Sequence, residues 1–259
     1  MFKKMMASMG AGGGSVETTL STPSAYPGGV VEGVINIRGG SVDQMIDYVA
    51  VGLVARVEIE SGDSEYDSYL KFHEHRVTGS FKLDDGSSHQ VPFQLQIPWE
   101  CPFNVIGGHQ LSKCFIGVRT ELEIQRSVDK TDVDPLAVYA LPAHEKLLAA
   151  FTQLGFRFKG ADMEKGRVTG GSLPFYQEIE FHPAPQFAHN VNELEVTFVT
   201  RATEMDVILE IDKRGGFFTE STDQIAKFTV PFAQVDNFDW TGNLNHYIGM
   251  LTQRRGMFH

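Results

Sequence analysis

Two histidines at alternate positions form the most obvious candidate metal site in the sequence. His73 and His75 lie in the segment FHEH, and an extended strand would place both imidazoles on one face. Imidazole nitrogens bind zinc when a third ligand comes from a neighbouring strand. The competing interpretation is a solvated strand, because Phe72 and Glu74 give the other face no clean apolar pattern. We adopt this second interpretation and predict neither a metal site nor a cofactor.

Two further segments are rich in carboxylates. GDSEYDS at 62–68 and DKTDVD at 129–134 do not follow the ligand order of a calcium loop, which ends on a bidentate glutamate. We interpret the first as a solvated turn. The second lies where the sequence pattern changes, so we predict that Asp129, Asp132 and Asp134 form a polar contact between two domains.

Catalytic chemistry has no motif to support it. Cys101 lies between two prolines in an apolar segment, instead of at a helix N-terminus that would lower the pKa of its thiol. The sequence has no G-x-S-x-G motif, and no nucleophile is associated with His144 and Glu145. We therefore predict a non-enzymatic protein without catalytic residues, in which Cys101 is a packing residue.

Composition and charge restrict the class of protein further. The chain of 259 residues has 22 Lys and Arg against 33 Asp and Glu, a net charge of −11 that disfavours binding to nucleic-acid phosphates. No apolar run approaches the roughly 20 residues of a membrane-spanning helix. A weak peripheral anchor built on Phe2, Met5, Met6 and Met9 stays an alternative. Cys101 and Cys114 are the only cysteines, and a disulfide between them stays an alternative. Because secreted proteins of this size more often carry several cysteines, we expect a cytoplasmic protein.

Alternation with a period of two residues runs through the first half and predicts half-buried β-strands. It occurs in VEGVINIR, from Val49 to Glu60 and over residues 115 to 126, with apolar side chains on one face and charged ones on the other. Glycine-containing turns such as PGG at 27–29 separate these strands. One polar face and short turns are typical of antiparallel sheets, so we predict a β-sandwich.

The second half contains the clearest predicted helix. In LPAHEKLLAAFTQLG, Leu147, Phe151 and Leu154 recur at helical spacing. Pro142 suits the first turn, and Gly155 suits the left-handed position just after the last turn.

Strand alternation then returns before the chain ends in a second helical pattern. The strands are expected in FYQEIEF at 175–181, ELEVTFVT at 193–200 and MDVILEID at 205–212, and the helix around Leu244, Tyr247, Ile248 and Leu251. We predict an all-β chain of two β-sandwich domains, 1–138 and 139–259, with one or two short helices in the second half.

An abrupt strand end occurs in VPFQLQIPWECPF, at 91–103. Val91, Phe93, Leu95 and Ile97 alternate, and prolines follow at 98 and 102. Proline cannot donate a ladder hydrogen bond and is tolerated at sheet edges and strand ends. We therefore predict an edge strand or strand end here, with Trp99 as a cap on the sandwich.

The order of several segments carries a family resemblance. The segments are FKKMMASMGAGGGSVET, YPGGVVEGVINIRGGSVDQMID, VPFQLQIPWECP, DKTDVDPLAV, LGFRFKGADMEKG, LPFYQEIEFHP and EIDKRGGFF. From residue 2 to about 218 the chain resembles the bacterial sporulation-control protein M family, whose fold is arrestin-like. The resemblance implies two arrestin-like antiparallel sandwiches joined by a short hinge. It also implies a cytoplasmic regulator of sporulation, stress response or cell division that acts through other proteins, and it supplies no catalytic or ligand-binding residue.

We accordingly expect a regulatory or adaptor protein that binds other proteins on a sheet face or edge strand. The alternative is a ligand-binding sandwich for carbohydrate or metal, centred on the two histidines or on Trp99 and Trp240. Exposed aromatic rings would favour that alternative, because sugar sites use them as flat platforms.

Overall fold

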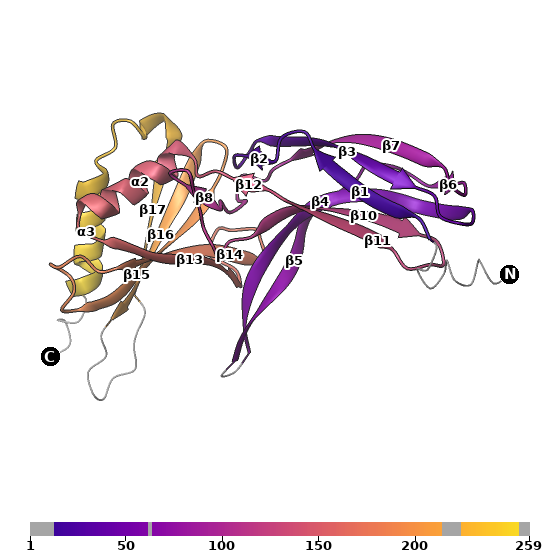
Figure 1. Ribbon diagram of the computed structural model, residues 1–259. Helices are drawn as coiled ribbons and strands as arrows, with labels where there is room; N and C mark the ends of the chain where they lie inside the picture. Colours follow the sequence, from indigo (N-terminus) through magenta and orange to yellow (C-terminus); the bar gives the residue numbers. More distant parts are fainter. Residues whose placement is uncertain (1–12, 62–63, 214–223, 254–259) are drawn as a thin grey trace. The chain divides into compact units, whose positions relative to one another are not determined.

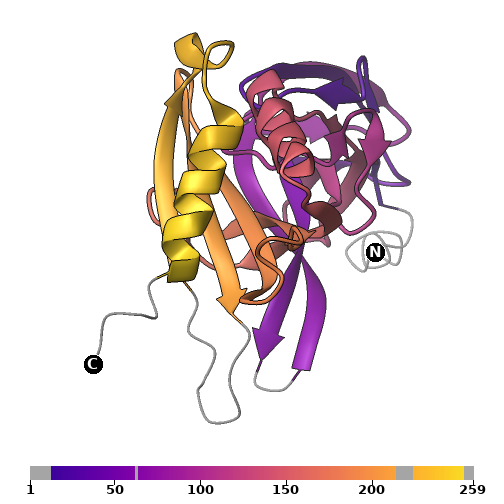
Figure 2. The ribbon, with the colours of Figure 1, turned by 90° about the vertical axis from the view of Figure 1, so that its left-hand side faces the viewer.

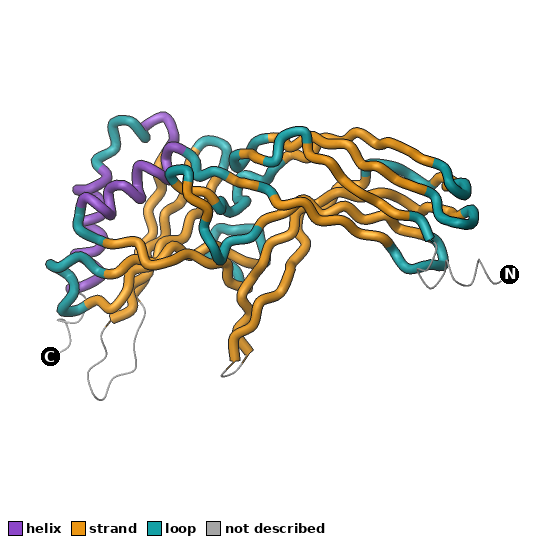
Figure 3. Tube along the Cα trace, viewed as in Figure 1, coloured by secondary structure: helices purple, strands orange, loops and turns teal. Residues whose placement is uncertain are grey.

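The computed structural model describes residues 13–61, 64–213 and 224–253 (Figure 1). The peripheral anchor considered above, from Phe2 to Met9, lies outside these residues. Strands account for most of the described chain, and the two α-helices both follow residue 141 (Figure 3). The prediction of an all-β chain with few helices is confirmed.

The described residues group into two compact units, and the chain changes unit after residues 56, 68, 98, 114 and 138. Unit 1 contains 13–56, 69–98 and 115–138, whereas unit 2 contains 57–68, 99–114 and the residues from 139 onward. The last change coincides with the predicted boundary at 138/139. That the two units are separate folding domains stays a prediction.

Unit 1 is built from two antiparallel sheets and a short two-stranded pairing. The first sheet has the order β1-β3-β7, and the second has β11-β10-β4 with β5 and β6 also paired to β4. The bounds are β1 Ser15–Leu20, β2 Ser24–Ala25, β3 Val30–Arg38, β4 Gln44–Ser61, β5 Ser64–Arg76, β6 Phe81–Leu83, β7 Ser88–Gln96, β10 Ile116–Ile124, β11 Lys130–Pro135 and β12 Ala137–Val138.

The alternation read from the sequence is the burial pattern of these strands. In β3, Val31, Ile35 and Ile37 are fully buried, while Arg38 is exposed. Between the sheets, the hydroxyls of Thr18 in β1 and Thr120 in β10 are hydrogen-bonded at 2.6 Å and buried. The apolar faces of both sheets thus enclose one core.

The proline-bounded strand end is β7. Among the described strands it pairs with β3 alone, at the end of the sheet order, and it finishes at Gln96 before Pro98. Pro92 lies within β7 opposite Val34. An edge strand has one side on which no ladder hydrogen bond is needed, which is why it accommodates a proline.

Unit 2 is a sheet with helices against it (Figure 2). Glu58, in the C-terminal part of β4, pairs with Glu164 of β13, and the order continues β14-β15-β16-β17. Helix α2 contacts β13, α3 contacts β17, and the helices contact each other. The bounds are β8 Val105–Ile106, β9 His109–Gln110, α2 Pro142–Gln153, β13 Arg157–Lys165, β14 Phe175–His182, β15 Val191–Thr200, β16 Glu204–Lys213, β17 Gln224–Pro231, the 3-10 helix η1 Phe232–Gln234 and α3 Trp240–Gln253.

Helix α2 begins and ends as its sequence predicts. Pro142 is its first residue, and Gly155 follows the C-terminus with φ +93°, a backbone conformation that costs glycine little. The Nδ1 atom of His144 accepts a hydrogen bond from the backbone N–H of Leu141. Phe151 is fully buried and packs against Phe156 and Phe181, so the apolar stripe of the helix faces the sheet.

In the part of the chain that the structure describes, neither α2 nor α3 has the length and apolar composition needed to span a membrane.

Candidate functional site

The two histidines that suggested a metal site are exposed near the end of β5. His73 has φ +54°, a left-handed conformation that is uncommon for a residue other than glycine, and its carbonyl oxygen lies close to Gly52 of β4. Phe72 is buried, whereas His73, Glu74 and His75 face solvent. Neither histidine belongs to a group of potential metal ligands among the described side chains.

The three aspartates of the predicted interdomain contact lie in or beside β11 of unit 1. Asp132 accepts a hydrogen bond from the backbone N–H of Thr18, and Asp129 accepts one from the backbone N–H of Ile124. Burial is the main cause that raises the pKa of Asp134, and Asp132 and Glu17 add to it. These interactions lie within unit 1, and a contact of the aspartates with the other unit stays a prediction.

Cys101, Cys114 and His144 are buried in unit 2. The two cysteines are not joined by a disulfide, and burial raises the pKa of Cys101 well above its usual range. Burial lowers the pKa of His144 to about 3, so its imidazole is neutral. Since Nδ1 accepts from an N–H group, the proton lies on Nε2, which donates to Thr200 Oγ1 at 2.9 Å. His144 also stacks on Phe103, so its contacts are those of a packing residue.

The two tryptophans also belong to unit 2. Trp240 donates its indole N–H to the carbonyl of Val235 at 3.2 Å and packs against Phe238. Trp99 is partly exposed, in the segment that follows β7. The two rings therefore occupy different settings, one packed at the start of α3 and one at the surface.

A run of carboxylates that sequence reasoning did not single out crosses four adjacent strands of unit 2. We call it the carboxylate row: Asp162 and Glu164 in β13, Glu178 in β14, Glu195 in β15 and Glu210 in β16. Asp162 lies directly opposite Glu178, and Glu195 directly opposite Glu210. The side chains project from the sheet face opposite to the buried residues Met163, Ile179 and Val196, with which they alternate.

The electrostatics of the row are unfavourable for ionised carboxylates. Partial burial is the main cause that raises the pKa of Glu178 to about 9, and the neighbouring Glu195 adds to it. Burial and then Glu210 raise the pKa of Glu195 to about 7. Lys159 pairs with Glu180 and Glu193 beside the row. Within the described chain, no lysine or arginine forms an ion pair with Glu178 or Glu195.

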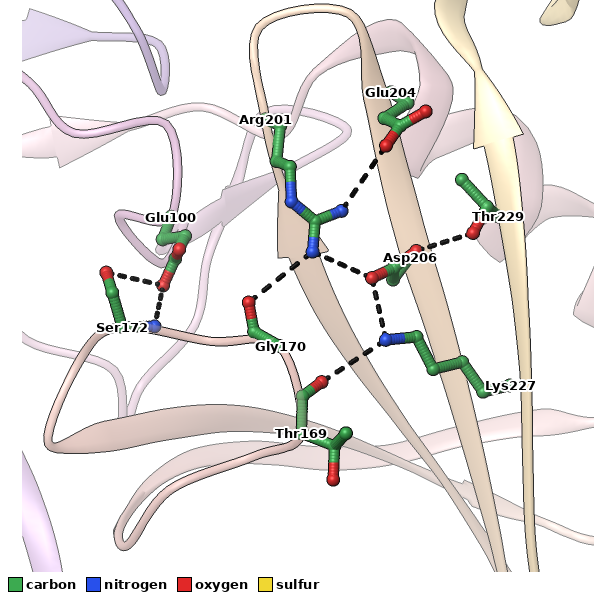
Figure 4. A network of polar contacts seen from close by, with 9 residues as sticks. All are labelled: Glu100, Thr169, Gly170, Ser172, Arg201, Glu204, Asp206, Lys227 and Thr229. Atoms are coloured by element: carbon green, nitrogen blue, oxygen red, sulfur yellow. Dashed lines mark hydrogen bonds and ion pairs between the residues drawn. The ribbon is translucent and has the colours of Figure 1, made fainter.

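In a second polar cluster, on the same sheet face, the charge of the buried carboxylate is compensated by cationic side chains (Figure 4). Asp206 of β16 is 4% exposed and accepts from Arg201 at 2.9 Å and from Thr229 at 2.6 Å, and Lys227 lies 2.8 Å from it. Burial alone would raise the pKa of Asp206, but these three partners outweigh it and lower the pKa to about 2.

The same two cations hold a loop in place. Arg201 and Lys227 also donate to the backbone carbonyls of Gly170 and Thr169, and Ser172 donates to Glu100 (Figure 4). The cluster therefore fastens the loop between β13 and β14 to the strands β16 and β17.

Strand β17 forms the end of the unit 2 sheet. It pairs with β16 from Glu204↔Pro231 to Ile211↔Gln224, and no described strand follows it in the sheet order. Ile225 is 56% exposed on this strand. An edge strand presents backbone N–H and C=O groups that another extended chain can pair with.

Comparisons with known proteins agree with one another. A family model described as SpoOM protein matches residues 2–215. The chain is 37% identical over 214 residues to the sporulation-control protein spo0M of Bacillus subtilis (strain 168). The aligned residues cover 82% of this chain and 81% of the relative. The crystal structure of Spo0M from Bacillus subtilis superposes with a TM-score of 0.79 and 29% identity, covering 93% of this chain and 99% of that one.

Proposed function

The chain belongs to the SpoOM protein family, and on this basis we propose that it is a non-enzymatic regulatory protein that acts by binding other proteins in the cytoplasm. The observation that carries the proposal is the match to a sporulation-control protein over most of both chains. The proposed process is sporulation control, or the stress and cell-division responses connected with it.

The chemistry of the buried groups supports a role without catalysis. A general base must be able to take up a proton near neutral pH, and a nucleophilic thiol must ionise there. Burial moves the pKa of His144 to about 3 and that of Cys101 in the opposite direction, away from this range. Their contacts serve packing and the start of α2.

We assign partner binding to the outer edge of β17, with which no other described strand pairs. The occupant would be an extended segment of a partner protein, because only a strand can pair with the whole row of backbone groups along an edge. Ile225 offers an apolar side chain for a side chain of that segment to cover. Lys227 would not oppose docking by its charge, since it is already paired with Asp206.

The test is complementation of a Bacillus subtilis strain that lacks spo0M. We expect the wild-type chain to restore normal sporulation and Ile225→Lys to fail, because a charge on the edge disfavours strand addition. The matched control is Val128→Lys, which places the same charge at a position in unit 1 that is 57% exposed and outside the strands. Melting curves should show that both variants fold like the wild type.

Two results would count against the proposal in different ways. If the wild-type chain is expressed but does not restore sporulation, the regulatory role is wrong. If Ile225→Lys restores sporulation as well as Val128→Lys does, the role stands and the edge of β17 is not the docking surface.

A further inference from the structure

The carboxylate row places like charges at the closest positions that a sheet allows. Directly opposite residues in an antiparallel pair have their Cβ atoms about 5 Å apart, and like charges there are destabilising. Asp162 opposes Glu178, and Glu180 and Glu210 both oppose Glu195, one on each side. Such a pattern is unfavourable unless something else compensates the charges.

The oxygens of the row converge in two overlapping groups. Among the described residues, one carboxylate oxygen each from Asp162, Glu164 and Glu178 lies within 4.8 Å of the others, and the same holds for Glu178, Glu195 and Glu210. Glu178 belongs to both groups and lies at the centre of the row. Three carboxylates at this separation can each reach one ion with small side-chain movements.

One member of the first group, Asp162, also has an oxygen without a hydrogen-bond partner, which points independently to a missing ligand. Asp162 is 8% exposed, and its Oδ1 atom is buried without a hydrogen-bond partner, which is rare for a buried carboxylate. Its other oxygen, Oδ2, lies 3.6 Å from Lys113, a side chain that is itself 63% exposed. Leaving a buried carboxylate oxygen unsatisfied is costly, so a cation at this oxygen would remove a real penalty.

We propose that the carboxylate row is a binding site for a hard divalent cation, with Ca²⁺ as the fitting ion, in which Asp162, Glu164 and Glu178 supply the first ligands. Carboxylate oxygens without nitrogen or sulfur ligands select Ca²⁺, Mg²⁺ or Mn²⁺ over zinc and copper. Ca²⁺ accepts six to eight oxygens in flexible geometry, which suits side chains projecting from a flat sheet, whereas Mg²⁺ demands a near-ideal octahedron.

Solvent can reach the site from one end. A pocket of about 560 Å³ is lined by Glu58, Glu164, Arg167 and Tyr176. Glu164 belongs both to the row and to the wall of this pocket, so an ion can reach the row through the pocket. Tyr176 Oη donates to Glu164 Oε2 at 3.2 Å and holds one ligand in position. Second-shell hydrogen bonds of this kind orient metal ligands.

The experiment is terbium luminescence on the full-length protein in metal-free buffer near pH 7.5. Tb³⁺ replaces Ca²⁺ in oxygen sites, and nearby aromatic rings such as Tyr176 sensitise its emission. We expect saturable emission that Ca²⁺ displaces and Zn²⁺ does not. Glu178→Gln, which removes the ligand common to both groups, should weaken Ca²⁺ binding by roughly tenfold or more.

The control variant is Glu123→Gln in unit 1. Glu123 belongs to another carboxylate group, with Glu121 and Asp129, in which Lys71 already pairs with Glu121. We expect this variant to bind Ca²⁺ like the wild type. Thermal melts in EDTA give a second measurement. Glu178→Gln should melt no lower than the wild type, because the row then holds one fewer ionisable carboxylate, and it should gain less from Ca²⁺.

Either of two results would overturn the proposal. The first is a wild-type protein that neither binds Tb³⁺ saturably nor melts higher in 5 mM Ca²⁺. The second is Ca²⁺ binding that is equally strong in wild type, Glu178→Gln and Glu123→Gln, which would place the ion elsewhere.

Discussion

The substitution Asp206→Asn tests whether the satisfied cluster in Figure 4 stabilises unit 2. The amide has nearly the shape of the carboxylate and keeps an acceptor for Thr229, but it loses the charge that pairs with Arg201 and Lys227. Folding lowers the pKa of Asp206 from 3.8 to about 2. At about 1.4 kcal/mol for each pKa unit, this fall corresponds to roughly 2 to 3 kcal/mol.

Solvent screening reduces this value. The side chains of Arg201 and Lys227 are 38% and 36% exposed, so both cations can regain water when the carboxylate is removed. We therefore expect Asp206→Asn to cost about 1 to 2 kcal/mol. With a urea m-value of about 2 kcal/mol per molar, the unfolding midpoint would fall by roughly 0.5 to 1 M.

Tryptophan fluorescence is a suitable assay because Trp99 and Trp240, the only two tryptophans, both belong to unit 2. Because the folded-state pKa of Asp206 lies below the unfolded value, its stabilisation is present above about pH 4 and is lost as the pH falls toward 2. The difference between wild type and Asp206→Asn should therefore shrink over that range.

The matched control is Asp236→Asn. Asp236 pairs with Lys146, but its side chain is 87% exposed, so the midpoint should stay where it is in the wild type. Equal midpoint shifts for Asp206→Asn and Asp236→Asn would refute the reasoning, because burial and the second cation would then contribute nothing.

Three further outcomes are expected. Folding raises the pKa values of Glu178 and Glu195 to about 9 and about 7, so their neutral forms favour the fold below about pH 4.5 and this stabilisation is lost as the pH rises through those values. The melting temperature in EDTA should therefore fall from pH 5 to pH 9, and less steeply in Glu178→Gln. Equal slopes in the two proteins would contradict the raised pKa of Glu178. Phe151→Ala should cost about 3 to 5 kcal/mol in urea unfolding, because the ring is fully buried, and a cost below 1 kcal/mol would mean that α2 is not part of the core. Cys101 and Cys114 should react with a thiol reagent only after unfolding, and rapid labelling of the native protein would contradict their burial.

The features that local sequence specifies were predictable. The strand pattern follows from period-two alternation, and α2 follows from Pro142, the spacing of Leu147 and Phe151, and the glycine at 155. The end of β7 before Pro98 was predictable from Pro98 and Pro102, since proline cannot continue a ladder of backbone hydrogen bonds, whereas Pro92 within the strand was not used in that prediction. In these cases the cause lies within a few residues of its effect.

The carboxylate row was not predictable in the same way, although its signal was present. DMEK, EIEF and LEID each place acidic residues at alternate positions, which reads as an ordinary solvated face. Only the pairing of the strands brings Glu178 next to Asp162, which is 16 positions earlier in the sequence, and Glu195 next to Glu210. The left-handed conformation of His73 was not predicted either, because nothing in the segment FHEH indicates it.

The repeated passage of the chain between the two units has a consequence for biosynthesis. Residues 57–68 and 99–114 leave the ribosome well before the helices and strands that complete unit 2, whereas unit 1 has all its residues once residue 138 has emerged. A nascent chain of that length would carry two unfinished pieces, one of them bearing Cys101, Phe103 and Cys114, which are buried in the finished protein. At a translation rate of about 5 to 20 residues per second, these apolar side chains stay exposed for several seconds before the rest of unit 2 has been synthesised. A gene cut at 138/139 would separate residues 57–68 and 99–114 permanently from the rest of unit 2. We therefore expect neither half to be a soluble fragment.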